Sequence, residues 1–263
     1  MDPAEIIKQV IEIAKRAGEF IRKERSDFDQ KRVEIKGKND LVSYVDKTAE
    51  QMIIDGLKPL LPDAGFIAEE NTASGKKEYN WIIDPLDGTT NFVHGIPCYA
   101  VSIALEHKGE IIIGVVYEVS RDECFYAHKG GKAFLNGKEI QVSQTKILKD
   151  ALIATGFPVN NFSRLQPNLG ALAYFMQNTH GVRRIGSAAT DLCYLACGRV
   201  DAFFEYNLNA WDVAAGILIV QEAGGKVTDF KGGKNFLFGR EIAASNGTLQ
   251  QEFQKVISEK FKE

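Results

Sequence analysis

One stretch in the first half of the chain constrains the fold more than any other. Its apolar run, Trp81 to Ile83, predicts a buried strand, and the strand is followed at once by Asp84, Pro85, Asp87 and the turn-forming Gly88. Strand ends that lead into helix starts are where α/β proteins hold anions and metals, because backbone N–H groups point outward there. Two carboxylates beside such a turn suit a divalent cation, which takes oxygen ligands from Asp, Glu and backbone carbonyls. The pattern therefore predicts a metal-assisted phosphate site.

The composition is that of an ordinary globular protein. Its 263 residues suffice for one large domain or two small ones, and 44% of them are hydrophobic and 25% charged. The net charge of −3 gives no sign of nucleic-acid or membrane binding. No apolar run approaches the roughly 20 residues of a membrane span, and the N-terminus has no signal-peptide pattern, so we expect a cytoplasmic protein. The four cysteines lack zinc-type spacing and are expected to be buried core residues.

The order of the predicted elements indicates two packed halves. A pair of helices comes first, starting with residues 2–24, and apolar hairpins follow over residues 100–127. Helices and strands then alternate from residue 151 onward. This order predicts an α+β half over about residues 1–145 and an α/β half over about residues 146–263, joined as a single unit that spans the chain.

Acids at the ends of other predicted elements strengthen the interpretation of a metal site. Glu69 closes a short strand, Asp212 begins a helix, and Glu205 ends a later strand. The proline between Asp84 and Asp87 lets the backbone turn, so that two side chains that would point to opposite faces of a straight strand can converge. Taken alone, Asp84 and Asp87 are equally well explained as turn formers, and Asp212 as a first-turn helix acid. Together they predict a two-metal cluster that activates water for an in-line phosphoryl displacement.

Two long motifs resemble signatures of the inositol monophosphatase family. The first runs from Trp81 to Phe92, and the second runs from Trp211 to Gly216 with Glu222–Gly225 behind it. Ala68–Glu70 and Gly186–Ala189 also match in order and approximate spacing, so the resemblance covers nearly the whole chain. It implies a layered αβαβα sandwich of the inositol monophosphatase and fructose-1,6-bisphosphatase type, of mixed α+β and α/β character. It also implies a homodimer that lithium inhibits.

The resemblance implies roles for individual residues as well. Two or three Mg²⁺ ions would be held by carboxylates and one backbone carbonyl, from Glu69, Asp84, Leu86, Asp87 and Asp212. Thr89 and Asp46 match the catalytic pair that orients the attacking water, and Glu69 joins them through a weaker third ion that it shares through waters. Lys36 matches a loop lysine near the metals. Substrate contacts are implied for Asp87, Gly88, Thr89, Gly186, Ser187, Ala188, Glu205 and Asp212.

The implied reaction is Mg²⁺-dependent hydrolysis of a small sugar or polyol phosphomonoester, with myo-inositol 1-phosphate as the first candidate. Glu69 lies only fifteen positions before Asp84, a shorter gap than the family resemblance suggests. A fructose-1,6-bisphosphatase or a dual-specificity sugar phosphatase therefore stays open. A haloacid dehalogenase is disfavoured, because two residues rather than one separate Asp84 from Asp87. Some bacterial members of the family also bind RNA polymerase, and Arg183–Arg184 is the candidate contact, with an ordinary surface ion pair as its alternative.

Overall fold

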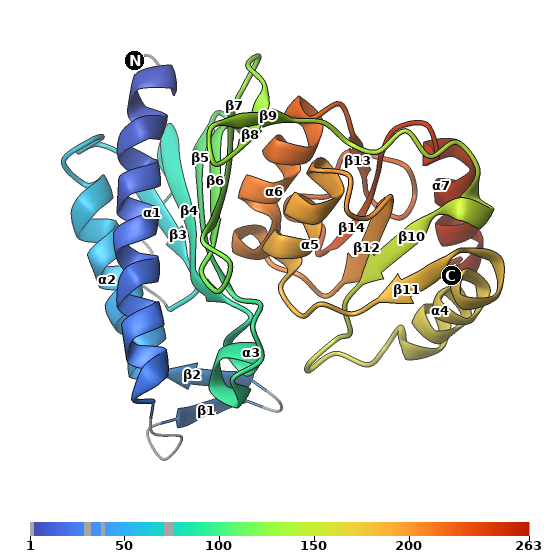
Figure 1. Cartoon of the computed structure of the whole chain (residues 1–263), viewed down its shortest axis with the longest axis horizontal. Helices are drawn as coiled ribbons and strands as arrows, with labels where there is room; N and C mark the ends of the chain where they lie inside the picture. The colour runs from blue at the N-terminus through green and yellow to red at the C-terminus, as the bar shows by residue number, and fades with distance from the viewer. Residues whose placement is uncertain (1–2, 29–32, 38–39, 71–75, 263) are drawn as a thin grey trace.

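Helices and sheets alternate in layers, in the order α, β, α, β, α (Figure 1). This computed structural model describes residues 3–28, 33–37, 40–70 and 76–262, leaving aside the side chains of 33–37 and 40–42. The order of the layers confirms the predicted sandwich and its mixed α+β and α/β character. None of the helices in these ranges combines the length and the apolar character needed to cross a bilayer.

The first outer layer consists of α1 (Pro3–Ser26) and α2 (Tyr44–Leu57), which lie side by side on one face of the larger sheet (Figure 1). A two-stranded ribbon of β1 (Val33–Gly37) and β2 (Asp40–Ser43) leads directly into α2. The buried face of α1 repeats at helical spacing, as its sequence predicts: Ile7, Val10, Ile13, Ala14, Ala17, Gly18 and Ile21. This stripe packs into a core that it shares with α2 and the sheet.

The larger sheet has seven strands that neighbour one another in chain order. Its first pair is parallel and the remaining pairs are antiparallel, as expected for strands joined by hairpins. A short helix, α3 (Thr89–His94), connects two of the strands. The strands are β3 (Gly65–Ala68), β4 (Tyr79–Asp87), β5 (Ala100–His107), β6 (Glu110–Glu118), β7 (Glu123–His128), β8 (Ala133–Leu135) and β9 (Lys138–Ile140).

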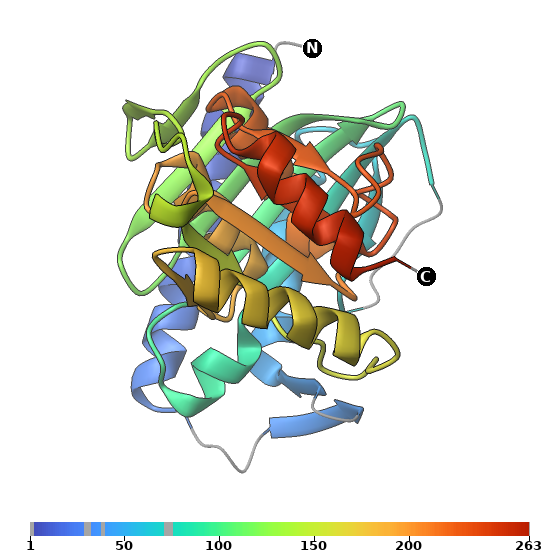
Figure 2. The same ribbon diagram turned by 90° about the vertical axis from the view of Figure 1, so that its right-hand side faces the viewer.

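The smaller sheet has five strands in the order β11, β10, β12, β14, β13. Pairs β10–β11 and β10–β12 are parallel, whereas β12–β14 and β13–β14 are antiparallel. Two helices, α4 (Leu165–Asn178) and α7 (Gln250–Lys260), cover its outer face (Figure 2). The strands are β10 (Leu152–Thr155), β11 (Gly181–Arg183), β12 (Ala202–Tyr206), β13 (Lys226–Thr228) and β14 (Glu241–Ser245).

The middle layer, α5 (Ala188–Ala196) and α6 (Ala210–Glu222), lies between the two sheets (Figure 1). Nine of the thirteen residues of α6 are buried, because the helix packs against the larger sheet on one side and α5 on another. The approach to the sheet is close at Gly114 of β6, where an added Cβ would lie 2.7 Å from the carbonyl oxygen of Ala215. The second half of the chain thereby supplies the helices that cover the inner face of the first half's sheet, opposite α1 and α2.

Candidate active site

Strand β4 continues past the point where its sequence predicts an end. The expected stop after Ile83 is wrong, because the strand pairs with β5 as far as Asp87. Asp84 pairs with Ser102 and Asp87 pairs with Ala100, so β4 holds one extra residue and forms a β-bulge. A bulge re-aims the side chains on either side of it, which allows two acids three positions apart to serve one site.

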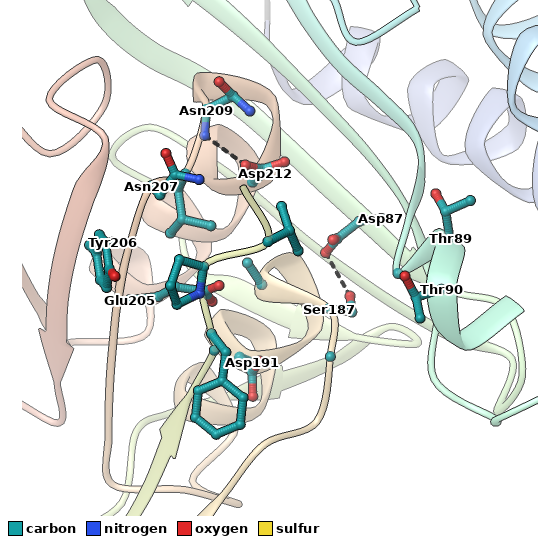
Figure 3. Close-up of a pocket in the computed structure, with 18 of the residues that line it drawn as sticks. Asp87, Thr89, Thr90, Ser187, Asp191, Glu205, Tyr206, Asn207, Asn209 and Asp212 are labelled. Atoms are coloured by element: carbon teal, nitrogen blue, oxygen red, sulfur yellow. Dashed lines mark hydrogen bonds between the residues drawn. The ribbon is translucent and has the colours of Figure 1, made fainter. Parts of the chain in front are cut away.

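Asp87, at the end of β4, faces a cleft of about 200 Å³ that both halves of the chain line (Figure 3). In Figure 3, Asp87 and Asp212 approach the cleft from different elements, β4 and α6. Glu69, at the end of β3, lines the same cleft. The sequence-predicted residues that line the cleft are Glu69, Asp87, Gly88, Thr89, Gly186, Ser187, Ala188, Glu205 and Asp212.

Three predicted site residues lie behind the cleft wall, namely Asp46, Asp84 and Leu86, with 1%, 2% and 0% of their surfaces exposed. Asp84 still interacts electrostatically with the acids of the cleft. Burial is the main reason that its pKa lies well above that of an ordinary Asp, and the charges of Glu69, Asp87 and Asp212 raise it further. The side chain of Lys36, expected near the metals, lies outside the described residues.

Backbone groups at the starts of two helices hold the acids in place. Asp87 Oδ2 accepts hydrogen bonds from Ser187 Oγ at 2.6 Å and from the Ala189 N–H at 2.7 Å, both at the start of α5. Asp212 Oδ2 accepts one from the Asn209 N–H at 2.6 Å, which completes a capping box on α6. Burial raises the pKa of Asp87 to about 6 in spite of its two donors, and burial and the charge of Asp87 raise that of Asp212 well above its ordinary value.

The chemistry of this donor set fits a divalent cation. Glu69, Asp84, Asp87 and Asp212 are buried or half-buried carboxylates, and after burial itself the charges of Glu69 and Asp87 raise the pKa of both Asp84 and Asp212, an unfavourable arrangement that a cation would reverse. Oxygen-only ligands of this kind suit Mg²⁺. In the described ranges, no three acidic, histidine or cysteine side chains are already grouped closely enough to hold an ion. A bound cation would offset the mutual repulsion of these carboxylates.

Thr89 and Asp46 come together from positions far apart in the chain. Thr89 Oγ1 lies 3.0 Å from Asp46 Oδ1 and also 3.0 Å from the Leu86 carbonyl oxygen, so its single proton can be donated to either acceptor. The other carboxylate oxygen of Asp46 accepts hydrogen bonds from the N–H and the hydroxyl of Ser43, the N-cap of α2. Burial raises the pKa of Asp46, while these bonds act in the opposite direction. The pair predicted from the sequence is therefore in hydrogen-bond contact.

The turn between β4 and α3 is fixed by Gly88 and Asn91. Gly88 has a φ of 94°, and an added Cβ would lie 3.0 Å from the Cys98 carbonyl oxygen and 3.2 Å from that of Gly186. Asn91 Nδ2 donates to the carbonyl oxygens of Cys98 at 2.8 Å and Ile185 at 3.0 Å. These bonds join the acidic turn of the first half to the segment that leads into α5.

The wall opposite the turn carries two more carboxyls. Burial raises the pKa of Glu205, near the end of β12, to about 8. Asp191 of α5 is only 1% exposed, its Oδ1 has no hydrogen-bond partner among the described residues, and burial raises its pKa well above the ordinary value. Sequence reasoning missed Asp191, although an acid four positions after the N-cap in an otherwise apolar helix was a visible signal.

Other lining residues were missed or assigned elsewhere. Asn160, Asn207 and Arg240 also line the cleft, and nothing in their local sequence indicates a site. Arg184, considered only as a partner contact, lines it too and lowers the pKa of Asp87. Ser187, predicted to contact the substrate, lines the cleft, and its hydroxyl donates to Asp87.

Carboxylates from both halves of a layered sandwich, placed beside a Thr–Asp pair, define a class of metal-assisted phosphomonoesterases. Comparison with known proteins agrees, since the model of the inositol monophosphatase family matches residues 2–263. The chain is 44% identical to a Neisseria meningitidis serogroup B protein named "Putative Nus factor SuhB", over 93% of this chain and 95% of the relative. It is 40% identical to the inositol-1-monophosphatase of Mesorhizobium japonicum, over 96% of both chains.

A solved structure gives the same result for the fold. The extragenic suppressor protein SuhB of Bartonella henselae matches with a TM-score of 0.91 and 40% identity, over 96% of this chain and 98% of that one. The chain therefore belongs to the inositol monophosphatase family, which is a family of metal-dependent phosphatases.

Proposed function

We propose that this protein hydrolyses a small polyol or sugar phosphomonoester, with myo-inositol 1-phosphate as the first substrate. The observation that carries the proposal is that Asp87 and Asp212 line one cleft beside the Thr89–Asp46 pair, while the buried Asp84 lies close enough for their charges to raise its pKa. The relatives named inositol-1-monophosphatase support the choice of substrate.

Two or three Mg²⁺ ions would be held by the predicted oxygen donors, namely Glu69, Asp84, the Leu86 carbonyl, Asp87 and Asp212. When bound, the ions would neutralise the phosphate and lower the pKa of the attacking water. Without them these carboxylates would repel a phosphate dianion, since they carry the same sign of charge. Activity should consequently depend entirely on the metal.

The Thr89–Asp46 pair would orient the water. When the Thr89 hydroxyl donates its proton to Asp46, its lone pairs are left to accept a hydrogen bond from a water molecule in the cleft. The first N–H groups of α3, next to Gly88 and Thr89, have no acceptor within the helix and can donate to a phosphate oxygen. Water and phosphate would then be positioned from the same turn.

Polyol hydroxyls would be bound on the opposite wall. Glu205 can accept hydrogen bonds from hydroxyl groups, and the backbone at Gly186 and Ala188 lines the same part of the cleft. Ser187 would act through Asp87 instead, because its hydroxyl is already donated there.

Phosphate release from myo-inositol 1-phosphate tests the proposal, with fructose 1,6-bisphosphate and 3′-phosphoadenosine 5′-phosphate as comparison substrates. The metal-free protein should be inactive, Mg²⁺ should restore release, and Li⁺ should inhibit it. Asp87→Asn should lower the rate on the order of a thousandfold, because it removes a charged ligand from the cluster. Asp63→Asn, at an exposed loop position, is the matched control and should behave as the unaltered protein. Near-normal activity of Asp87→Asn would refute the metal assignment.

A second candidate function involves other proteins. Exposed apolar side chains gather on α4 and the loop before it, including Phe157 (43% exposed), Leu169 (44%) and Met176 (64%), which supports a homodimer. Relatives named as Nus factors, together with the exposed Arg183 of β11, support a contact with RNA polymerase. In sedimentation velocity we expect the protein to sediment with twice the mass of one chain. We also expect it to co-sediment with RNA polymerase, and the Arg183→Glu variant to do so more weakly. A monomer that does not bind the polymerase would contradict both parts.

A further inference from the structure

The cleft has a polar edge that the proposed chemistry does not use. We define the outer rim as Asn160, Asn207 and Arg240, which line the cleft together with the carboxylates. Figure 3 places Asn207 along the same wall as Glu205 and Asn209. Asn160 and Arg240 are exposed and Asn207 is half-buried, whereas Asp191, deeper in the cleft, is buried. The part of a substrate that extends away from the reacting phosphate would meet this rim.

The three rim residues form one hydrogen-bonded network. Arg240 Nη2 donates to Asn207 Oδ1 at 3.0 Å and to the Asn207 carbonyl oxygen at 3.4 Å. Asn207 Nδ2 in turn donates to Asn160 Oδ1 at 2.8 Å. On the backbone, the N–H groups of Asn207 and Leu208 donate to the Arg240 carbonyl oxygen at 2.7 and 3.2 Å. The guanidinium is thus held at the cleft by a neutral amide.

The backbone of this network is left-handed at both ends. Asn207 has a φ of 68° and Arg240 has a φ of 63°, in the left-handed region that side chains other than glycine rarely adopt. Asparagine adopts this conformation more readily than most residues, so the strain falls mainly on Arg240. Strain of this kind persists where it places a group for function, and here it places an arginine at the mouth of the cleft.

Among the described residues, the guanidinium of Arg240 forms no ion pair with a neighbouring acid. Glu241, the next residue, accepts from Arg164 and from the Phe230 N–H. Within the described ranges, the side-chain hydrogen bonds of Arg240 go to Asn207 alone. A guanidinium has five N–H donors in a planar fork that matches the oxygens of a phosphate or a carboxylate. Most of this capacity remains available to a ligand.

The other arginine of the cleft differs in this respect. Arg184 lowers the pKa of Asp87, Asp191 and Glu205, so its charge already acts on the acids of the cleft. Arg240 is therefore the better candidate for recognising an anion that arrives with the substrate.

We propose that Arg240, held in place by Asn207, binds a second anionic group of the substrate, remote from the phosphate that is hydrolysed. The inference rests on the proposed phosphatase function and extends its substrate class to phosphomonoesters that carry another phosphate or a carboxylate. Arg240 thereby sets specificity without touching the reacting atoms.

A pair of substrates that differ only in the second anion tests this. We would measure kcat and KM for fructose 1-phosphate and fructose 1,6-bisphosphate with Mg²⁺, and the Kd of both by calorimetry on the full-length Thr89→Ala protein. Arg240→Gln should raise KM and Kd for the bisphosphate roughly tenfold, the size expected for a charge-assisted pair, and change the monophosphate values less than twofold. Arg240→Lys should retain part of the preference, because it keeps the charge and loses the fork.

Controls separate a binding role from a structural one. Lys234→Gln removes an exposed positive charge from the same loop, but Lys234 does not line the cleft. This variant should change KM and Kd for neither substrate. Equal weakening of both substrates by Arg240→Gln would mean that the arginine only supports the loop, and would overturn the inference. Equal Kd values for the two substrates in the parent Thr89→Ala protein would overturn it as well. If the unaltered protein showed no Mg²⁺-dependent turnover, the proposed function would be contradicted instead. The Kd values of fructose 1-phosphate and fructose 1,6-bisphosphate would still decide the role of the rim.

Discussion

At the scale of single residues, the candidate site contains buried acids that lower the stability of the folded protein. Asp191 and Glu205 are acids placed where burial disfavours their charged forms. Asp191 has an oxygen with no partner among the described residues, a cost that natural cores usually avoid. Such groups are expected where a ligand completes the hydrogen bonding, so substitutions that neutralise them should stabilise the protein while weakening its function.

Glu205→Gln should therefore make stability less dependent on pH. The pKa of Glu205 is raised to about 8 in the folded protein, from an ordinary value of 4.5. The folded state holds the proton more tightly, so its contribution to stability is fully present below pH 4.5 and is lost as the pH rises through 8. In thermal unfolding of the metal-free protein, we expect Glu205→Gln to raise Tm by a few degrees at pH 8 and to match the parent near pH 5. The exposed Glu259→Gln serves as control. An equal shift at both pH values would rule out this titration.

At the scale of secondary-structure elements, the sequence predicts the order of helices and strands but not how they bend. The apolar run of β4 and the capping residues of α2 and α6 follow from local patterns, because spacing and side-chain caps are local properties. The bulge that aims Asp84 and Asp87 does not, because it depends on the register with β5. The sequence identifies Asp84 and Asp87, but it predicts that they turn toward each other because the strand ends, whereas the structure turns them with a bulge inside β4.

The outer rim shows a second limit of sequence analysis. Asn207 and Arg240 lie 33 positions apart in separate loops, and only the antiparallel pairing of β12 with β14 brings them together. The left-handed backbone of Arg240 leaves no signal in residue type, since an arginine is not a favoured residue there. By contrast, Thr89 and Asp46 were predicted although they are 43 positions apart, because a family resemblance carried that information and the local pattern did not.

At the scale of the whole molecule, the cleft exists because the two halves share a layer. Helix α6 begins at the cleft, where it contributes Asp212, and then runs along the larger sheet as the centre of the main core. Its position therefore couples the packing of the core to the geometry of the acids. The contact at Gly114 fixes this position, because no side chain separates β6 from the helix backbone.

Gly114→Ala should disturb stability and metal binding together. The new Cβ would lie 2.7 Å from the Ala215 carbonyl oxygen, so α6 must move away from the sheet, at a cost of roughly 1–3 kcal/mol for overpacking. Because Asp212 moves with the helix, the Mg²⁺ concentration for half-maximal activity should also rise. Urea unfolding and Mg²⁺ titration measure the two effects. Gly170→Ala in α4 is the matched control, since its nearest neighbouring atom would be 3.7 Å away and alanine favours the helix. If Gly114→Ala lost stability but bound Mg²⁺ as the parent does, the cleft would be independent of the packing of α6.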